Sequence, residues 1–290
     1  MMRAARLLIL LVLAAPAGAQ TRASGQTNAS GGVLLPEQAC YDVGHYDLIL
    51  RVDPAQRSIE GRLAMRADLV APSRELLMHL DPALAVQRVL IRVQGGAEAR
   101  PVDAIREGGR LRVPLEGVEP GEALEVLVDY AGQPQEARNP PWDGGFTWAA
   151  TETGQPWIAT SCQGEGADLW WPCKDHPSDE PATFDLHISV PKPLVVATNG
   201  RLMSVEDGGF SREDGRPTSE DGWWTHHWHV STPINNYGVA LAIAPYVTVG
   251  TTVESVAGDS FEYTFWVLPE HREQAEAVLS EFVRELKGLE

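Results

Sequence analysis

The sequence contains few cysteines, and this scarcity limits how the fold can be held together. Only Cys40, Cys162 and Cys173 occur among 290 residues, so the chain lacks the disulfide framework that small secreted domains need. The odd count allows one bridge, with Cys162 and Cys173 as the nearest pair, plus a free thiol. Three buried free thiols are the other arrangement, and both stay open. None of the three lies in the histidine-flanked or elbow context that activates a nucleophilic thiol.

Basic residues are also scarce. The chain has 23 Lys and Arg against 40 Asp and Glu, which gives a formal net charge of −17. This excess of negative charge disfavours nucleic acid and anionic membranes as partners. It either attracts the cationic amino termini of peptides or serves solubility alone.

Long apolar runs are absent beyond the first residues, so no membrane span is predicted. Residues 1–19 have the pattern of a secretory signal peptide, with two arginines, the apolar run Leu7–Ala15 and a small-residue cleavage site ending at Ala19. Residues 20–35, rich in Gly, Ser, Thr and Asn, predict a disordered linker. We therefore expect an exported protein, periplasmic or secreted after cleavage near Ala19.

Apolar residues alternate with polar ones along several segments, a period of two that buries one face of a sheet. The pattern runs through residues 46–52, 59–69, 124–130 and 184–190, with Gly- and Pro-containing turns between the segments. These features predict an all-β fold over residues 36–268, a large antiparallel, curved two-sheet domain of sandwich or saddle form. Residues 269–290 instead repeat apolar side chains at three- and four-residue steps and predict one amphipathic helix.

The most distinctive segment, residues 161–181, combines loop-forming Gly and Pro with carboxylates, a carboxamide and two tryptophans. It contains Cys162-Gln163-Gly164-Glu165-Gly166 and then Trp171-Pro172-Cys173-Lys174-Asp175-His176-Pro177. Two further motifs follow in order, at residues 196–202 and 233–238. Together these motifs resemble the amino-terminal β domain of the aminopeptidase N family of zinc metallopeptidases, over about residues 40 to 290.

The resemblance implies a substrate-binding role for Gln163, whose side-chain oxygen would accept a hydrogen bond from the free α-ammonium of a peptide. Glu165 would support Gln163, add negative charge at the pocket wall, or brace the loop. The implied partners are peptides with a free amino terminus, and the implied cofactor of the full-length enzyme is zinc.

The catalytic zinc motif of that family, His-Glu-x-x-His, is missing, since none of the eight histidines is followed by Glu. We therefore assign this chain no catalytic residue and no metal, and predict that it is inactive alone. The helix at 269–290 is interpreted as the first helix of a truncated catalytic domain, whose missing part would pack on it. Packing of that helix on the β domain is the alternative.

Other residues leave further alternatives. Asp175, Asp179 and Glu180 are expected to brace turns. His227 and His229 would share a strand face, but two imidazoles alone do not make a structural zinc site. A second class of function is a stand-alone secreted β-sandwich that binds peptide or glycan through its tryptophans, namely Trp142, Trp148, Trp157, Trp170 and Trp171.

Overall fold

The structure of the protein is a computed structural model that describes residues 30–93, 96, 98–210, 218–254 and 258–289. The predicted signal peptide and residues 20–29 of the predicted linker lie outside these ranges. No helix in the described part of the chain is long and apolar enough to cross a membrane.

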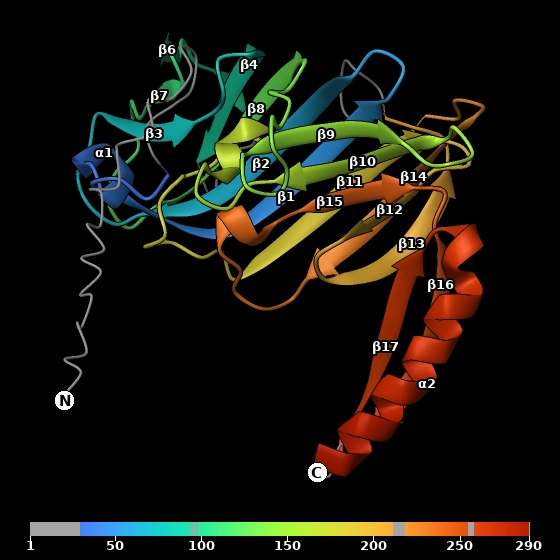
Figure 1. The fold of residues 1–290 in the computed structure, drawn as a ribbon. Coiled ribbons are helices and arrows are strands. Elements are labelled where there is room, and N and C mark those ends of the chain that lie inside the picture. Colours follow the sequence, from blue (N-terminus) through green and yellow to red (C-terminus); the bar gives the residue numbers. More distant parts are fainter. Residues whose placement is uncertain (1–29, 94–95, 97, 211–217, 255–257, 290) are drawn as a thin grey trace, which may run out of the picture.

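An eight-stranded sheet forms the largest layer (Figure 1). Its strands lie in the order β13 (Arg201–Asp207), β14 (Trp223–Val230), β11 (Thr183–Pro191), β1 (Tyr41–Asp53), β2 (Ser58–Leu69), β8 (Ala123–Gly132), β4 (Leu84–Val93) and β5 (Arg100–Pro101). The alternation predicted from the sequence is present, because Tyr46, Leu48 and Leu50 of β1 are fully buried while Asp47 and Ile49 between them are partly exposed.

Two smaller sheets supply the rest of the β body. One contains β12 (Val195–Thr198), β15 (Leu241–Ala244), β10 (Pro156–Ser161) and β9 (Gly145–Ala150), and the other contains β3 (Glu75–His79), β7 (Arg110–Pro114) and β6 (Ile105–Glu107). Their apolar side chains join those of the large sheet in one core. The prediction of an all-β domain built from antiparallel sheets is confirmed.

One pair of neighbouring strands departs from the predicted antiparallel arrangement. Strand β11 pairs with β1 in parallel, from His45 opposite Thr183 to Arg51 opposite Ser189. A parallel pair needs a long connection, and here the intervening chain supplies four strands of the large sheet, the whole three-stranded sheet and strands β9 and β10 before it returns.

The carboxyl-terminal part has its own small core. Strands β16 (Val247–Glu254) and β17 (Ser260–Val267) form a hairpin, and α2 (Arg272–Leu289) follows the 3-10 turn η3 (Pro269–His271) and packs on that hairpin. Ala275 and Leu279 of the helix are buried with Val249. The hairpin and helix extend away from the large sheet (Figure 1), and Trp266 contacts Trp228 of the main body at a centroid distance of 5.5 Å. A second, very short helix, α1 (Pro36–Ala39), precedes β1.

Candidate functional site

The segment singled out in the sequence connects β10 to β11, and we call residues 162–182 the site loop. Its amino-terminal turn is partly exposed, whereas residues 166–175 are buried and include the 3-10 turn η1 (Ala167–Leu169). The loop therefore consists of a small accessible tip on a buried base.

Trp170 and Trp171 form the centre of that base. Both are fully buried, and the Trp171 ring lies 5.0 Å from the rings of Tyr46 and Phe184. Edge-to-face contacts of this kind add about 0.5–1.5 kcal/mol each to the burial of the rings. The hypothesis that these two tryptophans stack on a ligand is therefore wrong. Local composition placed them correctly in a loop. It could not show that side chains of the large sheet and of the four-stranded sheet enclose them in the core.

A buried ion pair fixes the second half of the loop. Lys174 Nζ lies 2.6 Å from Asp179 Oδ2 and donates to the carbonyl oxygen of Tyr41 at 2.6 Å. Asp179 also accepts the backbone N–H of Val43 at 3.1 Å. Asp179 thus braces the loop against β1, as predicted.

The neighbouring carboxylates have similar roles. Asp175 accepts a hydrogen bond from Ser30 Oγ at 3.0 Å, and Asn235 Nδ2 lies 3.5 Å from Glu180 Oε1. These contacts agree with the expectation that the acidic residues hold turns in place.

Gln163 lies in the exposed tip of the loop. The carbonyl oxygen of Cys162 accepts the N–H groups of Glu165 and Gly166, at 3.1 and 2.9 Å, which closes a tight turn around Gln163. Gly164 and Gly166 adopt φ of +84° and +101°, conformations that favour glycine. The Gln163 side chain is exposed, while Glu165 is half-buried, and a methyl group at Gly144 would lie 2.7 Å from Glu165 Cβ. The turn thus presents Gln163 to solvent and holds Glu165 against the start of β9.

The other sequence motifs gather at the same sheet. Asn236, in the 3-10 turn η2 (Asn236–Gly238), donates through Nδ2 to the carbonyl oxygen of Lys174 at 2.8 Å. Asn199 Oδ1 accepts the N–H of Ala240 at 2.9 Å. Motifs separated by about 70 residues in sequence therefore join the loop, β12 and β15 into one supported surface.

The cysteines of the site loop cannot act as nucleophiles in this state. All three cysteines are free and buried. Burial raises the pKa of Cys162 to about 12 and raises the pKa of Cys173 well above its ordinary value. Both thiols are therefore protonated at neutral pH and lack the thiolate that attack requires.

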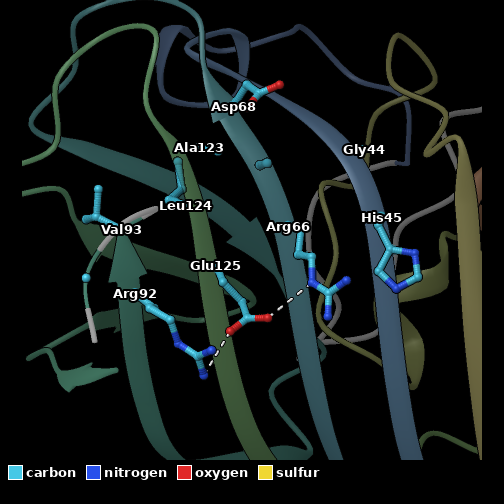
Figure 2. Close-up of a pocket in the computed structure, with 11 residues that line it drawn as sticks. Gly44, His45, Arg66, Asp68, Arg92, Val93, Ala123, Leu124 and Glu125 are labelled. Atoms are coloured by element: carbon cyan, nitrogen blue, oxygen red, sulfur yellow. Dashed lines mark hydrogen bonds and ion pairs between the residues drawn. The ribbon is translucent and has the colours of Figure 1, made fainter. Parts of the chain in front are cut away.

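A hollow of about 360 Å³ lies on the outer face of the large sheet. Figure 2 shows Arg66 of β2 and Arg92 of β4 both reaching Glu125 of β8 between them, at 3.2 Å each. These residues are direct cross-strand neighbours. Such rows of opposite charge stabilise an exposed sheet face, so we assign the hollow no functional role despite its size.

The histidines lie on both faces of β14. His227 and His229 share its partly exposed face, as predicted, whereas His226 is buried on the opposite face, where burial lowers its pKa to about 4. Across the described ranges, no group of three or more His, Cys, Asp or Glu side chains is arranged to hold a metal ion.

Comparisons with known proteins agree with this geometry. A model of the family described as the Peptidase M1 N-terminal domain matches residues 43–237. The chain is 23% identical over 240 residues to human glutamyl aminopeptidase, covering 80% of this chain and 23% of that protein. It is 26% identical over 145 residues to transcription initiation factor TFIID subunit 2 of Drosophila melanogaster, covering 47% of this chain and 11% of that protein.

Solved structures show the same fold. An M1 zinc metallopeptidase from Deinococcus radiodurans superposes with a TM-score of 0.59 at 22% identity, over 77% of this chain and 47% of that chain. Native yeast LTA4 hydrolase superposes with a TM-score of 0.63 at 18% identity, over 85% of this chain and 34% of that chain. The chain thus spans less than half the length of these similar proteins.

Proposed function

The chain belongs to the Peptidase M1 N-terminal domain family, and from that premise we propose that it is the substrate-recognition and scaffold portion of an exported zinc-dependent aminopeptidase. In this proposal the whole enzyme releases amino-terminal residues from peptides, and Gln163 binds the free α-ammonium. The observation that carries the proposal is the exposed Gln163 on a turn whose base is fixed by buried tryptophans and an ion pair.

The chemistry of Gln163 suits this role. An α-ammonium offers three charged donors, and a fixed side-chain oxygen favours it over an internal peptide group, which offers a single neutral N–H. One similar structure, an M1 zinc metallopeptidase from Deinococcus radiodurans, is described as bound to a Tyr-Ser-Ala substrate. Glu165 would add negative charge beside the bound ammonium.

Zinc belongs to the proposed enzyme, but the residues of this chain do not fit a catalytic zinc ion. The sequence has no His-Glu-x-x-His motif, and the described residues contain no three-ligand group. We therefore propose that the zinc ligands come from a catalytic domain outside this sequence, which packs on α2. The hairpin core leaves Val278 of α2 more than half exposed, at 54%, so the helix has apolar surface for such a neighbour.

Chelator sensitivity tests the reaction. The complete gene product should hydrolyse aminoacyl amides and lose that activity when zinc is removed. Undiminished turnover after metal removal would overturn the peptidase proposal. The 290-residue chain alone should show no turnover above background, and hydrolysis by it would refute the prediction that it is inactive.

A matched pair of substitutions tests the role of Gln163. Gln163 and the exposed Gln155 flank opposite ends of β10. In the complete product, Gln163→Ala should weaken binding of free-amino substrates by about 1 to 3 kcal/mol, the cost of leaving a charged donor unpaired. Gln155→Ala should leave the Michaelis constant and turnover unchanged. Equal kinetics for both variants would remove Gln163 from the site.

Export is tested separately. Fractionation of expressing cells should place the protein in the periplasm or medium, and amino-terminal sequencing should begin at Gln20. Retention of residues 1–19 on the mature protein would contradict the signal-peptide hypothesis.

The stand-alone binding module is the alternative proposal. This alternative is favoured by the similarity to a protein named as a transcription initiation factor subunit, because that name describes no peptidase. Of the five tryptophans, Trp142 is 79% exposed and remains the best candidate for ligand contact. Binding of peptides or glycans by the 290-residue chain, lost in Trp142→Ala, would support the module over the peptidase.

A further inference from the structure

The outer face of the large sheet carries a concentration of imidazoles and carboxylates that the proposed function does not use. They come from four neighbouring strands, β1, β11, β14 and β13. The group comprises His45, Asp47, Asp185, His187, Glu206, His227 and His229. On β1, β11 and β14 the side chains on this face point away from the core that the strands share with the smaller sheets, because their neighbours of opposite parity are the more buried ones.

His187 and His227 are the pair that differs from the rest. They are direct partners across β11 and β14, and their Nδ1 atoms lie 2.6 Å apart. Their other ring nitrogens face carboxylates, since His187 Nε2 lies 3.3 Å from Asp47 Oδ1 and His227 Nε2 lies 3.7 Å from Glu206 Oε2. Each imidazole therefore has a carboxylate on one side and the other imidazole on the opposite side.

The charges around the pair bear on where its protons lie. A carboxylate near each Nε2 favours a proton on that nitrogen through its charge, although neither contact is a hydrogen bond, since His227 Nε2 and Asp47 Oδ1 have no hydrogen-bond partner in the described part of the chain. With its proton on Nε2, each imidazole turns a lone pair on Nδ1 toward the other ring. The 2.6 Å contact then needs a cation, either a proton or a metal ion, shared by the two Nδ1 atoms.

From this geometry we propose that His187 and His227 form a binding site for a divalent transition-metal ion of the copper or nickel class, with the two Nδ1 atoms as ligands. With metal–nitrogen bonds of about 2.0 Å, adjacent ligands of a square-planar ion are about 2.8 Å apart, whereas those of a tetrahedral zinc ion are about 3.3 Å apart. The observed separation is closer to the square-planar value, and binding requires both rings to rotate so that the two Nδ1 lone pairs turn from each other toward the shared ion.

Water completes the coordination. No three-ligand group is present in the described part of the chain, so the protein supplies two nitrogens. The side chains of His187 and His227 are 26% and 17% exposed, which leaves the remaining positions open to solvent. The Phe210 ring lies 6.3 Å from both imidazoles and shields one side of the pair.

The adjacent histidines provide a matched control. His229 Nδ1 lies 2.5 Å from Asp185 Oδ1, and His45 Nδ1 lies 2.8 Å from Thr183 Oγ1. Their nitrogens already face oxygen partners on the same sheet surface, and no two of them converge as the Nδ1 atoms of the proposed pair do. They share exposure and strand context with the pair but not its geometry.

Copper(II) titration of the 290-residue chain, in the presence of glycine as a weak competitor, tests the site. We expect one tight equivalent whose electron paramagnetic resonance spectrum shows coupling to two nitrogens. His187→Gln and His227→Gln should each weaken binding by more than about tenfold, whereas His45→Gln and His229→Gln should leave it unchanged. Asp47→Asn, which removes no ligand, should weaken it by roughly 10- to 100-fold.

Three outcomes would overturn the proposal. They are tight binding retained in a folded His187→Gln or His227→Gln variant, equal weakening in His229→Gln, and no tight equivalent in the unsubstituted chain, which would mean that only a proton bridges the pair. Circular dichroism checks that each variant is folded, and the two ligand variants are independent, so either folded one decides. Copper(II) should also raise the melting temperature of the unsubstituted chain and not that of these variants.

Discussion

Replacing Lys174 with Met should destabilise the protein by about 3 to 5 kcal/mol, because it leaves the Asp179 carboxylate buried without its cation. The side chains of Lys174 and Asp179 are only 5% and 3% exposed. After the substitution, Asp179 would keep the N–H of Val43 as its partner, and the carbonyl oxygen of Tyr41 would lose the ammonium that donates to it. The methionine has nearly the same length as the lysine, so the loss measures charge rather than volume.

A surface ion pair in the same molecule provides the control. Lys192 pairs with Asp207, but their side chains are 39% and 86% exposed, so Lys192→Met should cost at most about 1 kcal/mol. Urea unfolding followed by tryptophan fluorescence measures the stability of both variants. If the unfolding free energy depends on urea concentration with the same slope in each variant, a shift of the transition midpoint reports a change in stability.

A double-mutant cycle identifies the source of the loss. Lys174→Met combined with Asp179→Leu removes both charges, and the double variant should be more stable than Lys174→Met alone, because replacing both members of a buried pair costs little. The reasoning would be refuted by a Lys174→Met variant within about 1 kcal/mol of the unsubstituted chain, or by additive effects in the cycle.

Three other predictions follow from the same structure. Gly166→Ala should lower the free energy of unfolding by about 3 kcal/mol, and Gly164→Ala by about 1–2 kcal/mol, as measured by urea unfolding. Both glycines have positive φ, but only at Gly166 would an added methyl group meet Asp168 Oδ1, at 2.5 Å. Equal losses of stability in the two variants would contradict this reasoning. Burial lowers the pKa of His79 and His226 to about 4. Between pH 4 and 6.5 the unfolded chain therefore binds more protons than the folded chain does. The stability that these neutral histidines provide is complete above pH 6.5, and the free energy of unfolding should fall by roughly 2 kcal/mol per histidine from pH 7 to 5. His226→Asn should flatten this dependence, and an unchanged pH profile would count against it. A thiol reagent should modify no cysteine in the folded chain and all three cysteines in denaturant. Modification of a single cysteine in denaturant would show that the other two form a disulfide.

Much of the fold could be predicted because half-buried strands leave a regular record in the sequence. The alternation around Tyr46 and Phe184 places β1 and β11 correctly, since burying one sheet face requires apolar residues at every second position. The pairing of these two strands could not be predicted in the same way. It depends on a return of the chain after about 130 residues, and alternation carries no information about direction.

Only part of the candidate site could be predicted, because sequence patterns locate a loop but do not show which of its residues are buried. The order of motifs located the turn that exposes Gln163, but composition could not separate the exposed tip from the buried base. Trp170 and Trp171 look like surface tryptophans beside glycine and proline, and only the sheets that close around them show otherwise. The His187–His227 pair was missed because its members lie 40 residues apart, and each alone resembles an ordinary polar position on a strand. An outward-facing histidine on each of two strands was the available signal, and it becomes informative only when the register is known.

The two proposed sites lie on opposite sides of one core, and this separation makes them physically independent. Gln163 projects from the end of β10, whose apolar residue Ile158 packs into the core that the small sheets share with the inner face of the large sheet. His187 and His227 lie on the outer face of that large sheet, with Ile188 and Trp228, their buried neighbours in sequence, pointing toward the same core. A metal ion on the outer face therefore contacts no residue of the site loop, and it can influence Gln163 only through the stability of the sheet. Copper(II) should then raise the unfolding temperature without changing the affinity of the complete enzyme for free-amino substrates, and a change in that affinity without a change in stability would show that this separation is not complete.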